Sequence, residues 1–427
     1  MYKQFKIISV LSATVILLAT FVGCSYKYDE IKSDSQLPDE KKDVTLYKVT
    51  SPSGLNFSKY AFTNDGFYEI LEHSTREGNI LYTDVNLKRR MYLTADLGVD
   101  PSSLDSTSYI DNISEGSCIG LTKENLYVFK RGSAQENSLD ENKRTAIEQR
   151  DLAGGNIKKV YLEPNMTMIE GSTVVADEEN IYFCVMDYSF GKDGKTVDGI
   201  VKIISLNQKD LKLQVIYEFD KKCYIEIKGV FEDNFIITRH YSNEQNEVIS
   251  DIIKFNLKSK NINVITELKQ FSSIKINSEI MYIFNNTDFT LESINLKNGE
   301  FKIYDNLFKM DYDKISLVSD IYDNHLFFSV SVGSLNEKWA LNLTTMELKK
   351  LEIYNDENFV GIYGEIKEYF LVITGMKVVK YMDTAPDKVT KFEAEKFVED
   401  IRLILKSDYW NNMPNYIEIE SDEIIYK

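Results

Sequence analysis

Short, aromatic-rich apolar segments recur along most of this chain, and each follows an acidic or amide residue. Glu124–Phe129 (ENLYVF) and Glu179–Phe183 (ENIYF) are two clear cases. Aromatic and β-branched side chains fit a pleated, half-buried surface, so we expect each segment to be a β-strand. Seven such segments recur, and their central residues are Tyr68, Tyr127, Tyr182, Ile236, Tyr282, Phe327 and Phe370.

A second pattern follows most of these segments. It is a strand that ends in Asn-Leu or Asp-Leu, then a tight turn, then another short strand. In Ile294–Glu300 (INLKNGE) the turn contains Asn-Gly, which accepts the positive φ that hairpin turns require. Phe301–Tyr304 then alternates in polarity, as a strand with one buried face does. Each unit is therefore predicted to be a meander of four strands.

The seven units predict an all-β fold. Their spacing falls from 59 to 43 residues along the chain, close to the roughly 40–50 residues of common propeller blades. One such sheet cannot cover both of its faces, whereas a closed ring of sheets buries the aromatic rows and protects the edges. We therefore predict a seven-bladed β-propeller over residues 44–427, with two successive β-sandwiches as the alternative.

Two segments near the ends of this region carry further expectations. Thr45–Val49 is expected to add an N-terminal strand to the last blade and so close the ring. Phe392–Val398 is expected to be a short helix or loop, and Asp400–Lys406 is expected to be a strand.

The first 23 residues have the pattern of a secretory signal. Two lysines precede the uncharged, mostly apolar run Ile7–Val22, and a small residue stands before Cys24. This run of 16 residues is short for a bilayer span of about 20. Phe21-Val22-Gly23-Cys24 resembles the lipobox of bacterial lipoproteins, with Phe21 where Leu is usual. The resemblance implies that residues 1–23 are removed and that Cys24 is diacylated; an ordinary membrane anchor is the alternative.

The segment 24–43 is polar, charged and poor in aliphatic residues, which predicts a flexible tether. Two acyl chains, such as palmitate, hold a protein stably on a membrane, whereas one does not. The expected location is therefore the extracellular face of the cell membrane, with the propeller held by its lipid anchor.

Two motifs extend this resemblance. Lys406–Tyr416 (KSDYWNNMPNY) lies near the C-terminus, and Asn79–Asp84 leads into Met91–Leu93 in the first unit. Both resemble uncharacterised β-propeller lipoproteins of low-GC Gram-positive bacteria. That family often continues the second motif with a cysteine-bearing segment, where Thr94–Asp96 stands in this chain. The resemblance implies a fold and a location, and no activity.

The formal net charge of −17 argues against nucleic-acid binding, which needs clustered Lys and Arg. Apart from Cys24 the chain has three cysteines, Cys118, Cys184 and Cys223, whose spacing matches no metal site. Cys184 lies in an apolar run and is expected to be a buried free thiol. A disulfide among the three is the alternative.

No catalytic, metal or cofactor site is predicted. The chain has no GxSxG, HExxH or P-loop pattern. We expect structural or solvent roles for its three histidines, with His73 in a loop, His240 just after a strand and His325 at the start of one. The loop Gly191–Gly199 lacks the acidic spacing of a calcium loop and is interpreted as a solvated turn.

Three functions fit these observations. The first is a non-catalytic binding or scaffold module for a protein, peptide or glycan ligand. The second is a glycan hydrolase or lyase, which would bring carboxylates with shifted pKa values about 5–9 Å apart in the central channel. The third is a sensor lipoprotein that partners a membrane protein. Tyr409 and Trp410 are the candidate pair for stacking on a ligand, although a plug at the end of the ring is the favoured role.

Overall fold

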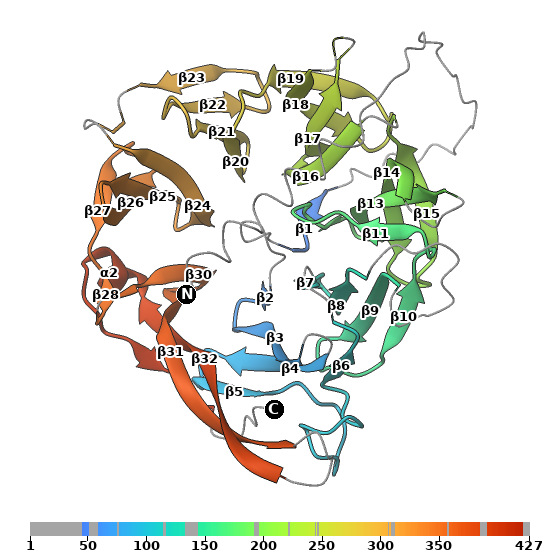
Figure 1. The fold of residues 1–427 in the computed structure, drawn as a ribbon, viewed down its shortest axis with the longest axis vertical. Coiled ribbons are helices and arrows are strands. Elements are labelled where there is room, and N and C mark those ends of the chain that lie inside the picture. The colour runs from blue at the N-terminus through green and yellow to red at the C-terminus, as the bar shows by residue number, and fades with distance from the viewer. Residues whose placement is uncertain are drawn as a thin grey trace.

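The computed structural model describes residues 45–50, 59–74, 77–113, 117–132, 144–191, 196–220, 223–243, 245, 247–305, 307–308, 312–356, 358–384 and 391–421. The signal segment, Cys24 and the tether of residues 24–43 lie outside these ranges. Seven antiparallel sheets are arranged around a central axis in chain order, so the protein is a seven-bladed β-propeller (Figure 1).

The first four blades follow one another around the ring (Figure 1). Blade 1 contains β2 (Tyr60–Phe62), β3 (Gly66–Ser74), β4 (Glu77–Asp84), β5 (Arg89–Tyr92) and β6 (Tyr109–Asp111). Blade 2 contains β7 (Cys118–Leu121), β8 (Asn125–Lys130), β9 (Ala146–Asp151) and β10 (Lys158–Tyr161). Blade 3 contains β1 (Tyr47–Lys48), β11 (Met166–Met168), β12 (Val175–Ala176), β13 (Asn180–Phe190), β14 (Thr196–Asn207) and β15 (Leu213–Glu218). Blade 4 contains β16 (Cys223–Phe231), β17 (Asn234–Ser242), β18 (Val248–Asn256) and β19 (Ile262–Glu267).

Three blades complete the ring. Blade 5 contains β20 (Ser272–Asn277), β21 (Ile280–Asn285), β22 (Leu291–Asn295) and β23 (Phe301–Tyr304). Blade 6 contains β24 (Lys314–Tyr322), β25 (His325–Val332), β26 (Leu335–Asn342) and β27 (Leu348–Leu351), and the small pair β28 (Tyr354–Asn355) and β29 (Asn358–Phe359) follows it. Blade 7 contains β30 (Gly361–Ile366), β31 (Tyr369–Thr384), β32 (Lys391–Leu405) and β33 (Ile417–Glu418), with the short helix α2 (Lys406–Trp410) before β33. Among the described residues, no helix is long and apolar enough to cross a membrane.

The apolar cores lie between neighbouring blades, as the repeated pattern predicts. All seven central residues of the sequence units fall in the second strand of a blade, and six of them are at least nine-tenths buried aromatics, with Ile236 fully buried. Between blades 1 and 2, for example, Tyr68 and Ile70 pack against Leu126 and Val128. Each sheet therefore buries both faces only because it has two neighbours.

Two expectations about the ends of the propeller are wrong. The N-terminal strand β1 does not join the last blade; it pairs with β12 at the inner edge of blade 3, where Tyr47 lies opposite Ala176. The segment from Lys391 to Leu405 is one continuous strand, β32, and not a helix or loop followed by a strand. It stays extended because it pairs along most of its length with the equally long β31.

No strand is shared between the described chain ends; blades 7 and 1 share a buried core that includes Phe67 and Leu403, and a clamp adds to it. The long β31–β32 hairpin reaches past blade 7 toward blade 1 (Figure 1), where Val379 and Val398 pack against Leu81 and Tyr92. At the outer edge, the backbone of Glu420 accepts from Arg90 N and donates to Lys88 O, both at 2.8 Å. The C-terminal segment thus joins the outer strands of blades 7 and 1.

The recurring Asn before each tight turn has one structural role. In blade 4 the Asn256 side-chain oxygen accepts from the backbone N–H groups of Lys258 (3.2 Å) and Ser259 (2.9 Å). Its amide nitrogen donates to Asn234 Oδ1 at 3.1 Å, which joins this turn to the turn before β17. The same side chain-to-backbone bonds are made by Asp84, Asn207, Asn295 and Asn342 in other blades.

The antiparallel order gives the ring two different ends. We call one end the turn face: it carries the connections between the first and second strands and between the third and fourth strands of each blade. We call the other end the loop face: it carries the connections between the second and third strands and those that lead to the next blade. In blade 5, the turn at Asn295–Glu300 lies on the turn face and the turn at Asn285–Thr290 lies on the loop face.

Candidate functional site

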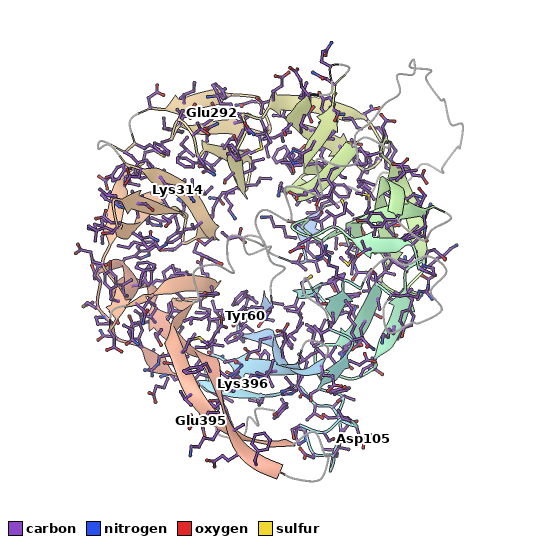
Figure 2. All side chains as sticks on the ribbon, viewed as in Figure 1. Tyr60, Asp105, Glu292, Lys314, Glu395 and Lys396 are labelled. Carbon is purple, nitrogen blue, oxygen red and sulfur yellow. The ribbon has the colours of Figure 1, made fainter. Side chains whose placement is uncertain are left out.

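A groove opens at the rim of the ring between blades 4 and 5, whose outer strands β19 and β23 lie at the top of Figure 1. Two adjoining cavities, of about 400 Å³ and 220 Å³, share Thr266 and Phe301 and together form this rim groove. Figure 2 labels Glu292, which lines it. The apolar lining residues are Ile265, Ile283, Ile294, Leu296 and Phe301.

The groove exists because the gap between blades 4 and 5 lacks the aromatic side chains that fill the gap between blades 3 and 4. Tyr217 of blade 3 and Thr266 of blade 4 occupy equivalent positions, each one step before a register shift in the outer strand pair. Tyr217 fills the gap between blades 3 and 4, with its ring centroid 5.1 Å from that of Phe255 and 4.8 Å from that of Phe219. At the next gap the equivalent of Phe255 is Ile294, since both precede the turn Asn.

The effect of these smaller side chains is large because neighbouring sheets of a ring diverge toward the rim. Interiors are normally packed without voids larger than a water molecule. Thr266 and Ile294 are too small to reach across, and Phe301 remains 49% exposed at the side of the opening. Apolar side chains beside an exposed aromatic residue are a common feature of binding clefts.

The two lysines that line the groove are held by contacts within the protein. Lys269 donates to Asp288 at 2.9 Å, and this hydrogen bond raises the pKa of Lys269. Lys254 donates to the carbonyl of Leu296 at 3.3 Å and lies 5.0 Å from the centroid of the Phe231 ring. The groove therefore combines apolar side chains with polar side chains such as Thr266, Ser272 and Asn285.

The groove also borders an open sheet edge. Among the described strands, β23 pairs only with β22, so its outer edge presents backbone N–H and C=O groups to a ligand. Phe301 and Ile303 face the groove side of this strand and are about half exposed. An extended peptide could add to such an edge and place alternate side chains in the groove.

Near the axis, charged groups from three blades come together. Lys275 on β20 donates to Asp320 on β24 at 2.9 Å. Burial, together with the charge of Lys275, lowers the pKa of Lys48 on β1, although Asp320 opposes the shift. The described carboxyl groups with a shifted pKa all shift downward, the direction opposite to that of a general acid: Asp65, Asp111, Glu148, Asp288 and Glu337.

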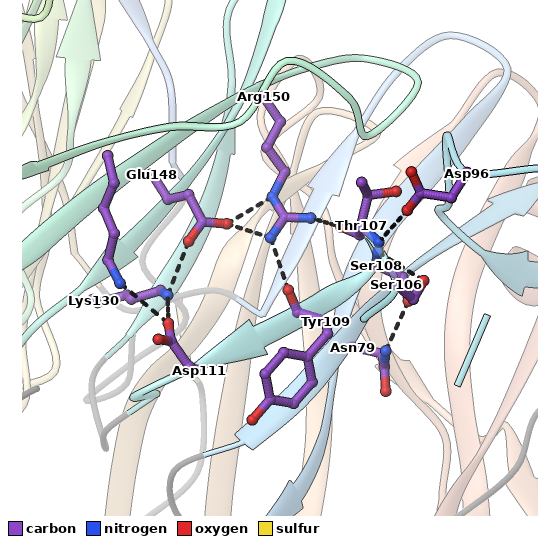
Figure 3. A network of polar contacts seen from close by, with 11 residues as sticks. Asn79, Asp96, Ser106, Thr107, Ser108, Tyr109, Asp111, Lys130, Glu148 and Arg150 are labelled. Atoms are coloured by element: carbon purple, nitrogen blue, oxygen red, sulfur yellow. Dashed lines mark hydrogen bonds and ion pairs between the residues drawn. The ribbon is translucent and has the colours of Figure 1, made fainter. Parts of the chain in front are cut away.

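A buried charge network lies between blades 1 and 2 (Figure 3). Glu148 accepts from both Arg150 and Lys130, whose side chains are each 1% exposed. Arg150 also donates to the backbone oxygens of Thr107 and Tyr109, and Lys130 pairs with Asp111 at 2.6 Å. Burial favours a raised pKa for Glu148, but Arg150 and Lys130 outweigh it and lower the pKa. The network holds β6 and the segment before it onto blade 2, which is a structural role.

The structure places the candidate aromatic pair between blades 6 and 7, away from an open surface. Tyr409 is fully buried and donates to the carbonyl of Val360 at 3.1 Å, so an exposed Tyr-Trp pair for ligand stacking is not formed. Trp410 is half-buried, stacks on His325 with 4.1 Å between ring centroids, and donates to Asp323 at 2.6 Å. Both side chains fix the helix α2 against the neighbouring blade.

The histidines have partners within the fold. His73 lies in β3 and contacts Asn79, while His240 lies in β17 and contacts Ser250 at 2.7 Å, so both belong to strands and not to the positions we expected. His325 begins β25 as expected, and burial lowers its pKa. Among the described residues, no group of three His, Cys, Asp or Glu side chains could hold a metal ion.

The three described cysteines are free and buried, which confirms the prediction for Cys184. Burial raises the pKa of Cys184 and Cys223 to about 12 and also raises that of Cys118. These thiols are therefore inert at neutral pH.

The rim groove was missed by our reading of the sequence, although a signal for it is present. Val215–Asp220 (VIYEFD) and Val264–Lys269 (VITELK) align without a gap, and the aromatic residues of the first are replaced by Thr266 and Leu268 in the second. A repeat that loses its rim aromatics predicts a gap beside the blade that carries it.

Comparisons with known proteins do not extend the description beyond the fold. No family model and no curated protein sequence matches this chain. Among solved structures, it is similar to the β-propeller domain of the Trilobed protease from Pyrococcus furiosus, with 10% identity, a TM-score of 0.49, and coverage of 88% of this chain and 98% of that domain.

Two enzymes are also similar in structure to most of this chain. An acylaminoacyl peptidase bound to a chloromethyl ketone is 12% identical, with a TM-score of 0.48 over 89% of this chain and 53% of the peptidase. An ulvan lyase of a polysaccharide lyase family is 10% identical, with a TM-score of 0.45 over 86% of this chain and 99% of the lyase. This chain thus spans about half of the peptidase. At such identities and TM-scores the similarity carries no conclusion about the activity of this chain.

Proposed function

We propose that this protein is a lipid-anchored, extracellular β-propeller that binds an extended segment of a partner protein in the rim groove. The observation that carries the binding role is the open gap between blades 4 and 5, where the preceding gap between blades 3 and 4 is filled by Tyr217. A protein partner is favoured over a glycan because four aliphatic side chains line the groove beside the β23 edge, which offers backbone hydrogen bonds.

The binding proposal is tested by filling the groove. Thr266→Tyr introduces the residue that closes the preceding gap, so we expect the fold to be kept and the groove to be lost. Val264→Tyr is the matched control: it lies on the same strand, is 57% exposed, and pairs with Ile253, which packs on the opposite side toward blade 3.

The readout is a covalent adduct formed in living cells. The photoreactive residue p-benzoylphenylalanine replaces Phe301, and ultraviolet light then links it to whatever occupies the groove. We expect an adduct with an apolar segment of one protein, identified by mass spectrometry, that Thr266→Tyr abolishes and Val264→Tyr leaves intact. An adduct that persists in Thr266→Tyr, or none at all from position 301, contradicts the proposal.

The anchor is tested separately. Cells that express the wild type or Cys24→Ala are fed an alkyne analogue of palmitate. We expect labelling of the wild type only, with the variant released from the membrane fraction. Equal labelling of both proteins contradicts lipidation at Cys24.

A further inference from the structure

We propose that the turn face of the propeller is directed toward the membrane and the loop face away from it, because β1 brings the chain into the ring at the axis from the turn face. The inference rests on the proposed lipid anchor at Cys24. It concerns which end of the ring is available to partners, and not whether the rim groove binds one.

The direction of β1 follows from its pairing. β1 is antiparallel to β12, and Tyr47 lies opposite Ala176 while Lys48 lies opposite Val175. β12 runs toward the turn at Asp177–Glu179, which belongs to the turn face. Tyr47 is therefore nearer the turn face than Lys48, and Thr45 is the described residue at which the chain enters the ring.

The segment from Leu46 to Thr50, which contains β1, is held firmly at this position. Val49 N donates to Val174 O at 2.8 Å, and Thr50 Oγ1 accepts from Val174 N at 3.0 Å. On the other side, Leu121 N of blade 2 donates to Val49 O at 3.2 Å. Leu46, Val49 and Thr50 are all more than nine-tenths buried. Force on the preceding segment therefore acts on a fixed point near the axis.

Covalent geometry limits the other orientation. The 21 residue steps from Cys24 to Thr45 span at most about 70 Å. If the loop face met the membrane, the same segment would first have to cross a blade of four strands, about 20 Å wide, and then pass the height of the ring, about 30 Å for nine-residue strands. That path uses most of the length, whereas the direct path from the turn face uses little of it.

This orientation also divides the rim groove. The 220 Å³ cavity is lined by Lys269, Ser272 and Asn285, which lie toward the loop face, while the 400 Å³ cavity is lined by Asn295, Leu296 and Gly299 toward the turn face. A partner would therefore approach the smaller cavity from the side that faces away from the membrane. It would approach the larger cavity from the side that faces the membrane.

The test measures which end of one blade is nearer the lipid. Thr287→Cys and Lys297→Cys place single exposed thiols at equivalent turn positions at opposite ends of β22, since both backbone N–H groups are bound by a turn Asn at 2.8–2.9 Å. The native thiols Cys118, Cys184 and Cys223 are buried and do not compete for a maleimide dye. The lipidated full-length protein is reconstituted in vesicles that carry a headgroup-labelled acceptor lipid.

We expect higher energy transfer to the acceptor from position 297 than from position 287. Equal or reversed transfer at the two positions, with the protein bound to vesicles, overturns the orientation and leaves the anchor intact. Cys24→Ala should lose transfer at both positions. If the protein that keeps Cys24 also fails to bind vesicles, the anchor proposal fails, and the orientation fails with it.

Discussion

Gly364 on β30 shows how a single residue permits the ring to close. A Cβ atom at this position would overlap the ring of Phe62 on β2, across the seam between blades 7 and 1. Phe62 in turn contacts Phe67, with 5.9 Å between ring centroids. The absence of a side chain at Gly364 therefore lets the first and last inner strands approach each other.

We expect Gly364→Ala to destabilise the protein by about 1–3 kcal/mol, because Phe62 has to leave its packed position. Gly361→Ala on the same strand is the control, since its Cβ would meet only Tyr363, at 3.9 Å. Urea unfolding followed by tryptophan fluorescence measures both variants. A Gly364→Ala protein as stable as the control would show that the contact does not matter.

The network in Figure 3 makes a prediction about acid stability. Burial favours a raised pKa for Asp111, but Lys130 and Lys159 outweigh it and lower the pKa to about 2. A carboxyl group whose pKa is lower in the folded state stabilises the fold above its unfolded pKa of about 4, and this contribution is lost as the pH falls toward 2.

We therefore expect Asp111→Asn to be less stable than the wild type above about pH 5, with a smaller loss of stability between pH 4 and pH 2. Unfolding free energies measured across this range by urea titration would check the slope. Parallel curves for the two proteins would contradict the role of Asp111.

At the scale of elements, the turn that follows the third strand in blades 1 to 6 is held by its first side chain. In blade 4, Asn256 makes two bonds to backbone N–H groups, one to Ser259 Oγ (3.0 Å) and one to Asn234. We expect Asn256→Ala to cost about 1–2 kcal/mol. Asn256→Asp keeps the acceptor oxygen and should cost less, as thermal unfolding of the two variants would show; equal losses would contradict the turn role.

Much of this repeated structure could be predicted from the chain. The seven central residues and the Asn-containing turns recur because every blade faces the same packing problem, so the number of blades follows from the pattern. The pairing of β1 could not be predicted, since a two-residue strand has no periodicity and its place depends on which inner edge is open. In β32 the segment Phe392–Leu405 mixes helical and strand spacing, and only its partner β31 decides between them.

The candidate site was less predictable than the fold for a physical reason. Tyr409 and Trp410 are aromatic residues in a polar segment, which is typical both of a ligand platform and of a local core, and the structure buries Tyr409. The rim groove depends on the lack of an aromatic side chain, because Thr266 stands at the position that Tyr217 fills in the preceding blade. A pattern that records which residues are present gives little weight to such a loss.

At the scale of the whole molecule, the hairpin clamp adds to the buried core that blades 7 and 1 share around Phe67, Leu371 and Leu403. Val398 is 9% exposed and packs against blade 1, whereas its neighbour Phe397 is 70% exposed on the other face of the hairpin. Tyr60 adds a hydrogen bond to Glu399 at 3.1 Å. The clamp thus joins strands that are more than 300 residues apart in the chain.

We expect Val398→Asp to destabilise the propeller by more than about 2 kcal/mol, because it buries a charge in the seam. Phe397→Asp should have little effect, since that side chain is already in water. Limited proteolysis of the two variants reports on the seam, with faster cleavage expected only for Val398→Asp. Similar cleavage of both would argue that the hairpin does not close the ring.

The position of β1 has a mechanical consequence. A pull on the proposed lipid anchor would load the strand pair β1–β12 in blade 3, and the junction between blades 7 and 1 lies elsewhere on the ring. Tension from the membrane would therefore act on blade 3, within a continuous part of the ring. The junction between blades 7 and 1, where the first and last blades meet, would not carry this load directly.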